Sequence, residues 1–240
     1  MEPIDILKSI LNNEYETEDG DRYKVELEEG MTESEIKSFV KVLPNNFLDE
    51  SIKELIRFSK GFNFHGLEDV SFNAFGHFGL EEVFPNSIQL ASDGFGNYWV
   101  LDIGNNGEWK EVYFVCHDPA AIVKHSKNIS EFIQHVDEFG RLGSESNLDI
   151  IHEKIVFDVY EGKVENHEKS INEFDFPDEF ITQLPEDYVI IDLENQPIKS
   201  GFNWAKFGPN TRIIRFGDRP IWVLEKKKGF LRKIYDLLRK

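Results

Sequence analysis

Three apolar segments with the pattern of β-strands follow one another between residues 88 and 116, and only turns separate them. The second turn contains Asn105-Asn106-Gly107, which favours a hairpin because Asn and Gly tolerate positive φ. Neither link is long enough for a crossover helix, so neighbouring strands are predicted to run antiparallel. The three predicted strands are residues 88–91, 98–103 and 111–116.

Helical patterns precede these strands. Apolar residues repeat at helical spacing in residues 3–12 and 48–60. Between them, Thr32 and Glu35 have the spacing of a capping box, which predicts that another helix starts there. Gly61 follows the third helix and is predicted to end it.

Helices are also predicted after the strands. Pro119 is expected to begin a short helix that Asp118 caps, and a longer helix starts at Ser130. Residues 140–147 are rich in Gly, Ser and Asn, which is typical of a linker. The predicted fold class is therefore α+β, with a central, mostly antiparallel sheet flanked by helices and a smaller C-terminal α+β part.

The chain of 240 residues is long enough for one large or two modest domains. We predict a first domain over residues 1–143 and a C-terminal region over residues 144–240. Short motifs recur in the same order in both, so the second region is either a shortened copy of the first or shares common turn fragments by chance. The clearest matches are Gly61-Phe62-Asn63 with Gly201-Phe202-Asn203, and Trp99-Val100-Leu101 with Trp222-Val223-Leu224.

Charge is unevenly distributed along the chain. Residues 226–240 hold seven Lys and Arg and one acidic residue, whereas the other 225 residues carry a net charge of −24. Such an acidic body repels nucleic acid and anionic membranes and can attract a basic protein. The basic C-terminal segment has an amphipathic helical pattern, and it is expected either to dock onto the acidic body or to contact a membrane surface.

The sequence predicts no catalytic centre, metal site or cofactor. Cys116, His117 and Asp118 are the residue types of a thiol triad, but Cys116 and His117 are neighbours on a strand and point to opposite faces. Cys116 is the single cysteine and is expected in the core. No export signal or membrane-spanning stretch is visible, so we expect a cytoplasmic protein.

Several motifs resemble those of the SUKH superfamily. Leu43-Pro44, followed by a helix and a glycine, resembles the opening of the family. Residues 88–99 resemble its central glycine-rich turn and strand, residues 112–118 resemble the following strand with its His-Asp element, and residues 129–133 resemble its final helix. The matching positions, mostly structural, are Leu43, Pro44, Gly61, Asp93, Gly94, Gly96, Trp99, His117 and Asp118.

The resemblance covers about residues 31–139 and implies a SUKH-like fold. The family includes bacterial immunity proteins, which neutralise toxins, and fungal regulators of cell-wall glucan synthesis. Its members resemble binding modules rather than enzymes. Asn97 stands where many members carry Asp, which weakens the case for a charged role at that position.

The sequence and the resemblance together predict a non-catalytic, intracellular immunity protein that neutralises a toxin, with a basic nuclease as one candidate. The alternative is a regulatory scaffold in cell-envelope or cell-wall synthesis. Aromatic anchors in a polar rim are typical of protein-binding hot spots. The predicted partner contacts are Phe64, His65, Glu68, Asp69, Phe78, Glu81 and Glu82.

Overall fold

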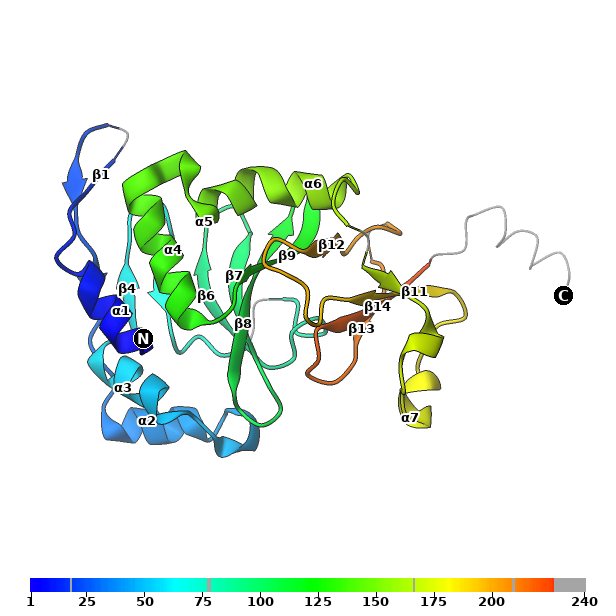
Figure 1. Ribbon diagram of the computed structural model, residues 1–240. Coiled ribbons are helices and arrows are strands. Elements are labelled where there is room, and N and C mark those ends of the chain that lie inside the picture. The colour runs from blue at the N-terminus through cyan, green and yellow to red at the C-terminus, as the bar shows by residue number, and fades with distance from the viewer. Residues whose placement is uncertain (18, 77–78, 166, 209, 227–240) are drawn as a thin grey trace, which may run out of the picture.

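A five-stranded antiparallel sheet forms the centre of the computed structural model, which describes residues 1–226 apart from residues 18, 77–78, 166 and 209 (Figure 1). The sheet has the order β12-β9-β8-β7-β6, and turns join β6 to β7 and β7 to β8 as predicted. The predicted α+β class with a mostly antiparallel central sheet is therefore confirmed. Its strands are β6 (Ser87–Ser92), β7 (Tyr98–Ile103), β8 (Trp109–His117), β9 (Ala120–Ser126) and β12 (Gly201–Asn203).

One face of this sheet packs against helices. Alternate residues of a strand point to the same face, so Trp99, Leu101 and Phe114 all enter the main core. Helix α4 lies across this face and contacts α1, which in turn contacts α3 (Figure 1). Phe132 and Val136 of α4 are fully buried there. The N-terminal helices and α4 are α1 (Pro3–Ile10), α2 (Glu33–Val40), α3 (Glu50–Phe58) and α4 (Ile129–Leu142).

The predicted capping box at the start of α2 is confirmed. The backbone N–H of Thr32 donates to Glu35 Oε2 over 2.7 Å, and the backbone N–H of Glu35 donates to Thr32 Oγ1 over 3.3 Å. These bonds satisfy two backbone donors that the first helical turn leaves without partners. The start of α2 can therefore be predicted from these neighbouring residues without any long-range contact.

The prediction that Gly61 ends the third helix is wrong. Helix α3 ends at Phe58, and Gly61 instead begins strand β4. A Cβ at this position would lie 2.1 Å from the carbonyl oxygen of Val70 on β5, so the close approach of two strands requires glycine. The small strands of this N-terminal part are β1 (Tyr15–Glu16), β2 (Arg22–Tyr23), β3 (Glu26–Leu27), β4 (Gly61–Asn63) and β5 (Val70–Ser71).

The short helix predicted at Asp118-Pro119 is also wrong. Strand β8 continues to His117, which pairs with Ala120 at the start of β9. The two residues between them form the turn of a β-hairpin and are joined by a cis peptide bond. Asp118 therefore lies exposed at the end of the sheet and caps no helix.

The linker predicted at residues 140–147 is mostly part of helices. Helix α4 continues through Gly140, where a Cβ would lie 2.3 Å from Cδ1 of Tyr15. Glycine is thus present because the ring of Tyr15 packs against the helix. The predicted division of the chain into two domains after residue 143 stays a prediction. The helical segments that follow are α5 (Asn147–Ile150), the π-helical η3 (Ile151–Ile155) and α6 (Val156–Tyr160). The 3-10 helices are η1 (Pro44–Asn46), η2 (Gly143–Glu145) and η4 (Ile171–Glu173).

A second, four-stranded sheet covers the other face of the central sheet. Its order is β10-β11-β14-β13, and all its pairings are antiparallel. Tyr113 and Ile122 from the central sheet pack with Trp222 and Leu224 from the second sheet. The two sheets thus enclose a common core between them. The second sheet and its helix comprise β10 (Glu168–Lys169), β11 (Tyr188–Asp192), β13 (Ile213–Arg215), β14 (Ile221–Glu225) and α7 (Asp178–Ile181).

A buried ion pair joins the two sheets. Arg215 of β13 donates to both carboxylate oxygens of Asp102 on β7, over 2.7 and 2.5 Å. The guanidinium carbon of Arg215 also lies 5.4 Å from the ring centre of Phe84 and 5.3 Å from that of Trp222. Burial alone would lower the pKa of Arg215, but the charge of Asp102 raises it overall, so the guanidinium stays charged.

The two Gly-Phe-Asn motifs take similar local structures in different places. Both form short strands, and Gly201, like Gly61, has no room for a Cβ, which would lie 2.3 Å from the carbonyl oxygen of Ile122. The strand partners differ, because β4 pairs with β3 and β5 whereas β12 pairs with β9. That the second region is a shortened copy stays a prediction.

The basic C-terminal segment lies outside the described residues, except for Lys226, whose Nζ is 3.3 Å from Asp187 Oδ1. Among the helices that the structure describes, none combines the length and the apolar character needed to cross a membrane.

Candidate functional site

The glycine-rich turn, residues 93–97, connects β6 to β7 at one end of the central sheet. Oδ1 of Asp93 accepts a hydrogen bond of 2.8 Å from the backbone N–H of Phe95. Gly94 and Gly96 have φ values of 76° and 89°, a region that favours glycine. These features fix the path of the turn and leave the Phe95 side chain at its tip, 79% exposed.

Asn97 joins this turn to the hairpin turn between β8 and β9. Its Nδ2 donates to Asp93 Oδ2 over 2.6 Å, and its Oδ1 accepts from the backbone N–H of His117 over 3.0 Å. A carboxylate at this position would have no hydrogen to donate to Asp93. The amide therefore suits a position that must both donate and accept.

His152, from the π-helical segment η3, holds the glycine-rich turn from the other side. Its Nε2 lies 3.0 Å from Asp93 Oδ2, and its Nδ1 lies 2.6 Å from Glu153 Oε1. Both ring nitrogens thus face carboxylates, and both can donate only in the imidazolium form. The ring also stacks on Trp99, with 6.5 Å between ring centres.

Asp93 is the common acceptor of this network. Burial alone would raise its pKa, but hydrogen bonds from Asn97, from the backbone of Phe95 and from His152 lower the pKa overall. Asp93 is therefore ionised at neutral pH. Both of its carboxylate oxygens accept hydrogen bonds from within the protein.

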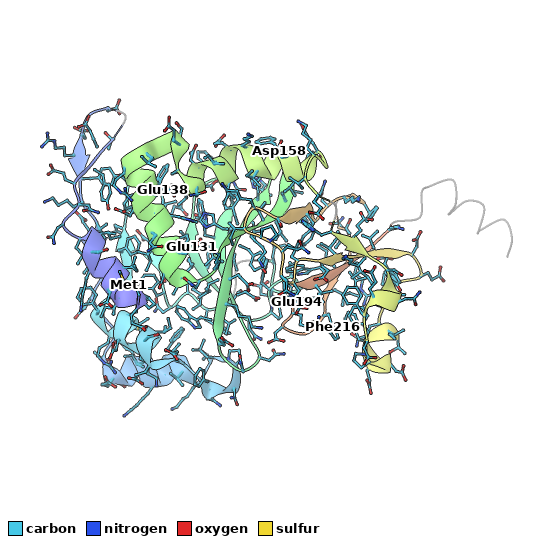
Figure 2. The ribbon with its side chains drawn as sticks, viewed as in Figure 1. Met1, Glu131, Glu138, Asp158, Glu194 and Phe216 are labelled. Carbon is cyan, nitrogen blue, oxygen red and sulfur yellow. The ribbon has the colours of Figure 1, made fainter. Side chains whose placement is uncertain are left out.

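A cavity of about 290 Å³ lies between the two turns and the helical segment η3–α6. Phe95 and Phe157 both line it and are 79% and 46% exposed. The exposed carboxylates of Asp118 and Glu153 line the same cavity. Asp158, which follows Phe157 on α6, marks this end of the molecule in Figure 2.

Residues 30–135 match the model of the SMI1 / KNR4 family (SUKH-1). This part of the chain, residues 30–135, is therefore similar to the SUKH superfamily. No curated protein and no solved structure matches the chain. The SUKH match ends before η3 and α6, so His152 and Phe157 come from outside the matched region.

The fold unites only part of the SUKH motif predicted from the sequence. Leu43 is buried, and Pro44 lies at the opposite end of the sheet, where its carbonyl oxygen would be 2.8 Å from a Cβ on Gly107. Gly61 lies in β4. The positions that gather on or beside the glycine-rich turn are Asp93, Gly94, Gly96, Trp99, His117 and Asp118.

Phe64 is wrong as a predicted partner contact. Its side chain is only 4% exposed, and its ring packs edge-on against Tyr15 and Tyr23. The neighbouring His65 is exposed, and its ring centre lies 5.2 Å from that of Tyr23. Phe78 lies outside the described residues.

The predicted acidic contacts lie in two places. Glu68 is at the glycine-rich turn, where its backbone N–H donates to the carbonyl oxygen of Ser92 over 2.8 Å, and Asp69 is exposed beside it. Glu82 is exposed and Glu81 is half-buried in the loop before β6. Their role as partner contacts stays a prediction.

Cys116 lies in the core as predicted, 3% exposed. Burial raises the pKa of its thiol to about 11, so the thiol is protonated at neutral pH. Nδ1 of His117 faces Oδ1 of Asn97 over 3.0 Å. Within the part of the chain that the structure describes, no group of three or more His, Cys, Asp or Glu side chains is placed to hold a metal ion.

Sequence reasoning missed His152, Glu153 and Phe157. They lie beyond the SUKH match, and no spacing in the sequence links them to residue 93. A π-turn often marks a functional site, but the sequence does not predict the π-turn either. Phe95 was visible within the glycine-rich motif, although its exposure was not.

Proposed function

We propose that this SUKH protein is a non-catalytic, intracellular immunity protein that binds and neutralises a protein toxin. The binding surface is the end of the sheet formed by the glycine-rich turn, the β8–β9 turn and α6, here called the turn face. The observation that carries this proposal is Phe95, a large apolar side chain that is 79% exposed on a turn fixed by hydrogen bonds.

A rigid, exposed aromatic side chain costs little conformational entropy when it enters a partner. Asp93 accepts bonds from Phe95, Asn97 and His152, so the turn is ordered before any partner arrives. Phe157 supplies a second exposed ring on the same cavity. Two aromatic anchors with a polar rim fit the pattern of a binding hot spot.

Binding suits this site better than catalysis. Both nitrogens of His152 already face carboxylates, and the thiol of Cys116 is buried and protonated. A general base needs a free nitrogen, and a nucleophilic cysteine needs the thiolate form. His152 does not meet the first requirement and Cys116 does not meet the second.

A basic toxin is the partner that the charges favour. The chain carries a net charge of −18, and Asp118 and Glu153 are exposed on the turn face. Opposite charge accelerates the encounter of two proteins and favours the correct orientation. A nuclease, which needs positive charge to hold nucleic acid, is one such toxin.

The test is a growth-rescue experiment in cells that express the candidate basic toxin with this chain. Rescue by the wild type and by Phe47→Ala, but not by Phe95→Ala, would support the proposal. Phe47 is a matched control because it is also exposed, at 44%, but borders Gly107 at the other end of the sheet. Equal rescue by both variants would contradict the use of the turn face.

A regulatory scaffold in cell-envelope or cell-wall synthesis is the second candidate, because the SMI1 / KNR4 match is also compatible with a regulator. A scaffold would bind several envelope or signalling proteins. An immunity protein would bind one toxin stoichiometrically. The composition of the purified complex therefore separates these two functions.

A further inference from the structure

The cavity of the turn face combines carboxylates with aromatic rings. Its carboxylates include Asp118, exposed on the β8–β9 turn, and Glu153, whose side chain is 61% exposed and whose Oε1 already lies 2.6 Å from His152 Nδ1. Its rings are those of Phe95 and Phe157. Asp93 also lines it, but both of its oxygens are already bonded within the protein.

The size of the cavity limits what can enter. At about 290 Å³ it lies at the lower end of the range for small-molecule pockets, which is roughly 300 to 1,000 Å³. A single side chain of a partner protein fits this scale better than a cofactor. The exposed carboxylates favour a cation, and the rings favour one that can lie flat against them.

The same protein already binds a guanidinium in such surroundings. Arg215 is held by the two oxygens of Asp102, and the rings of Phe84 and Trp222 lie 5.4 and 5.3 Å from its guanidinium carbon. The buried site is filled from within the chain. The cavity of the turn face has the same kinds of group and opens to solvent.

We propose that this cavity receives an arginine side chain of the protein partner. The inference rests on the proposed function, since the arginine belongs to the protein that the turn face binds. Asp118 and Oε2 of Glu153 accept hydrogen bonds from the guanidinium, and Phe95 and Phe157 pack against its planar faces. Arginine fits better than lysine because its planar group can bond a carboxylate at two points while it stacks on a ring.

The experiment is an NMR titration of the full ¹⁵N-labelled chain with N-acetyl-arginine methylamide. N-acetyl-citrulline methylamide is the matched control probe, because it keeps the shape but has no positive charge. The expected result is a saturable shift of the amide signals of Phe95, Asn97 and Phe157 with the arginine probe alone. No shift at these residues, or equal shifts with citrulline, would overturn the proposal.

Two variants locate the binding groups. Asp118→Asn and Glu153→Gln should each weaken binding of the arginine probe by about five-fold, the effect of one lost charge contact. Asp175→Asn and Glu145→Gln remove the same charges at exposed positions that do not line the cavity, and should leave binding unchanged. Equal weakening by all four would overturn the site, because it would reflect net charge alone.

The outcomes separate this inference from the proposed function. If the arginine probe fails while the chain still protects cells from a toxin, the cavity assignment is wrong and the immunity function stands. If the probe binds in the cavity but the chain protects against no toxin, the cavity assignment stands and the immunity function fails. A native amide spectrum for each variant shows that a loss of binding is not a loss of folding.

Discussion

The Arg215–Asp102 pair and the turn face both join the SUKH region to residues that follow it, yet they differ in solvent access. The two side chains of the buried pair are 2% and 1% exposed. At the turn face, the side chains of His152 and Asp93 are 25% and 8% exposed, and Phe95 is far more open. Similar groups therefore stabilise the fold in one place and remain available to a partner in the other.

This difference gives the C-terminal region two roles. Its four-stranded sheet closes one face of the central sheet, while the segment η3–α6 supports and extends the glycine-rich turn. Changes at the buried pair should therefore alter stability, and changes at the turn face should alter binding.

The largest effect is expected from Arg215→Ala. The substitution leaves the carboxylate of Asp102 buried without its partner, which should lower the free energy of unfolding by about 3 to 5 kcal/mol in a urea titration. The control is Arg219→Ala, since Arg219 pairs with Glu194 near the same sheet. Figure 2 labels Glu194. That pair is partly exposed and should contribute less than about 1 kcal/mol. Equal losses of unfolding free energy in the two variants would contradict the claim that the buried Arg215–Asp102 pair is the more important for stability.

Phe95→Ala should leave the free energy of unfolding almost unchanged, because the side chain is exposed. Loss of a hot-spot side chain should weaken partner binding by about 30-fold, equivalent to about 2 kcal/mol. Calorimetry with the purified partner measures this change. Phe47→Ala should leave the affinity for the partner unchanged. A similar loss of affinity in Phe47→Ala would mean that the partner does not bind specifically at the turn face.

His152→Ala should have an intermediate, local effect. It removes the hydrogen bond to Asp93 and should cost about 1 to 2 kcal/mol. Amide exchange should accelerate at Phe95 and Asn97, whose N–H groups bond to Asp93. Unchanged exchange at both amides would show that His152 does not support the turn.

The smallest effect is the pH dependence of stability that the buried His125 causes. Burial lowers the pKa of His125 well below its ordinary value, so the folded protein keeps this ring neutral. Below about pH 6.5 the unfolded chain binds more protons than the folded chain, and stability falls as pH falls. For one histidine the loss between pH 7 and 6 is about 0.7 kcal/mol. His125→Asn should reduce by that amount the fall in unfolding free energy between pH 7 and 6, measured by urea titration at each pH. An unchanged fall would contradict the claim that His125 causes it.

Local sequence signals predicted β6, β7 and β8 of the central sheet, but not β9 or β12. Alternating strands and an Asn-Gly turn needed no long-range contact to be recognised, and the same holds for the capping box at Thr32. The errors at Gly61 and Gly140 share a cause. In both positions glycine is required by a neighbour from elsewhere in the chain, Val70 in one case and Tyr15 in the other.

The turn face was only half predictable. The motif identified Asp93, Gly94 and Gly96. His152, which contacts Asp93 from η3, lies 59 residues further along the chain. Phe64 was predicted as a contact because several phenylalanines cluster near it in sequence. Its burial is set by Tyr15 and Tyr23, which come from a separate hairpin.

Affinity purification from native cells tests most directly whether the turn face binds the partner. The tagged wild type, Phe95→Ala and Phe47→Ala are purified in parallel at low and moderate salt, and the proteins that accompany them are quantified by mass spectrometry. We predict one stoichiometric basic protein with wild type and Phe47→Ala, released as salt rises and strongly reduced with Phe95→Ala. The same protein recovered equally with all three baits would contradict the claim that the turn face binds the partner.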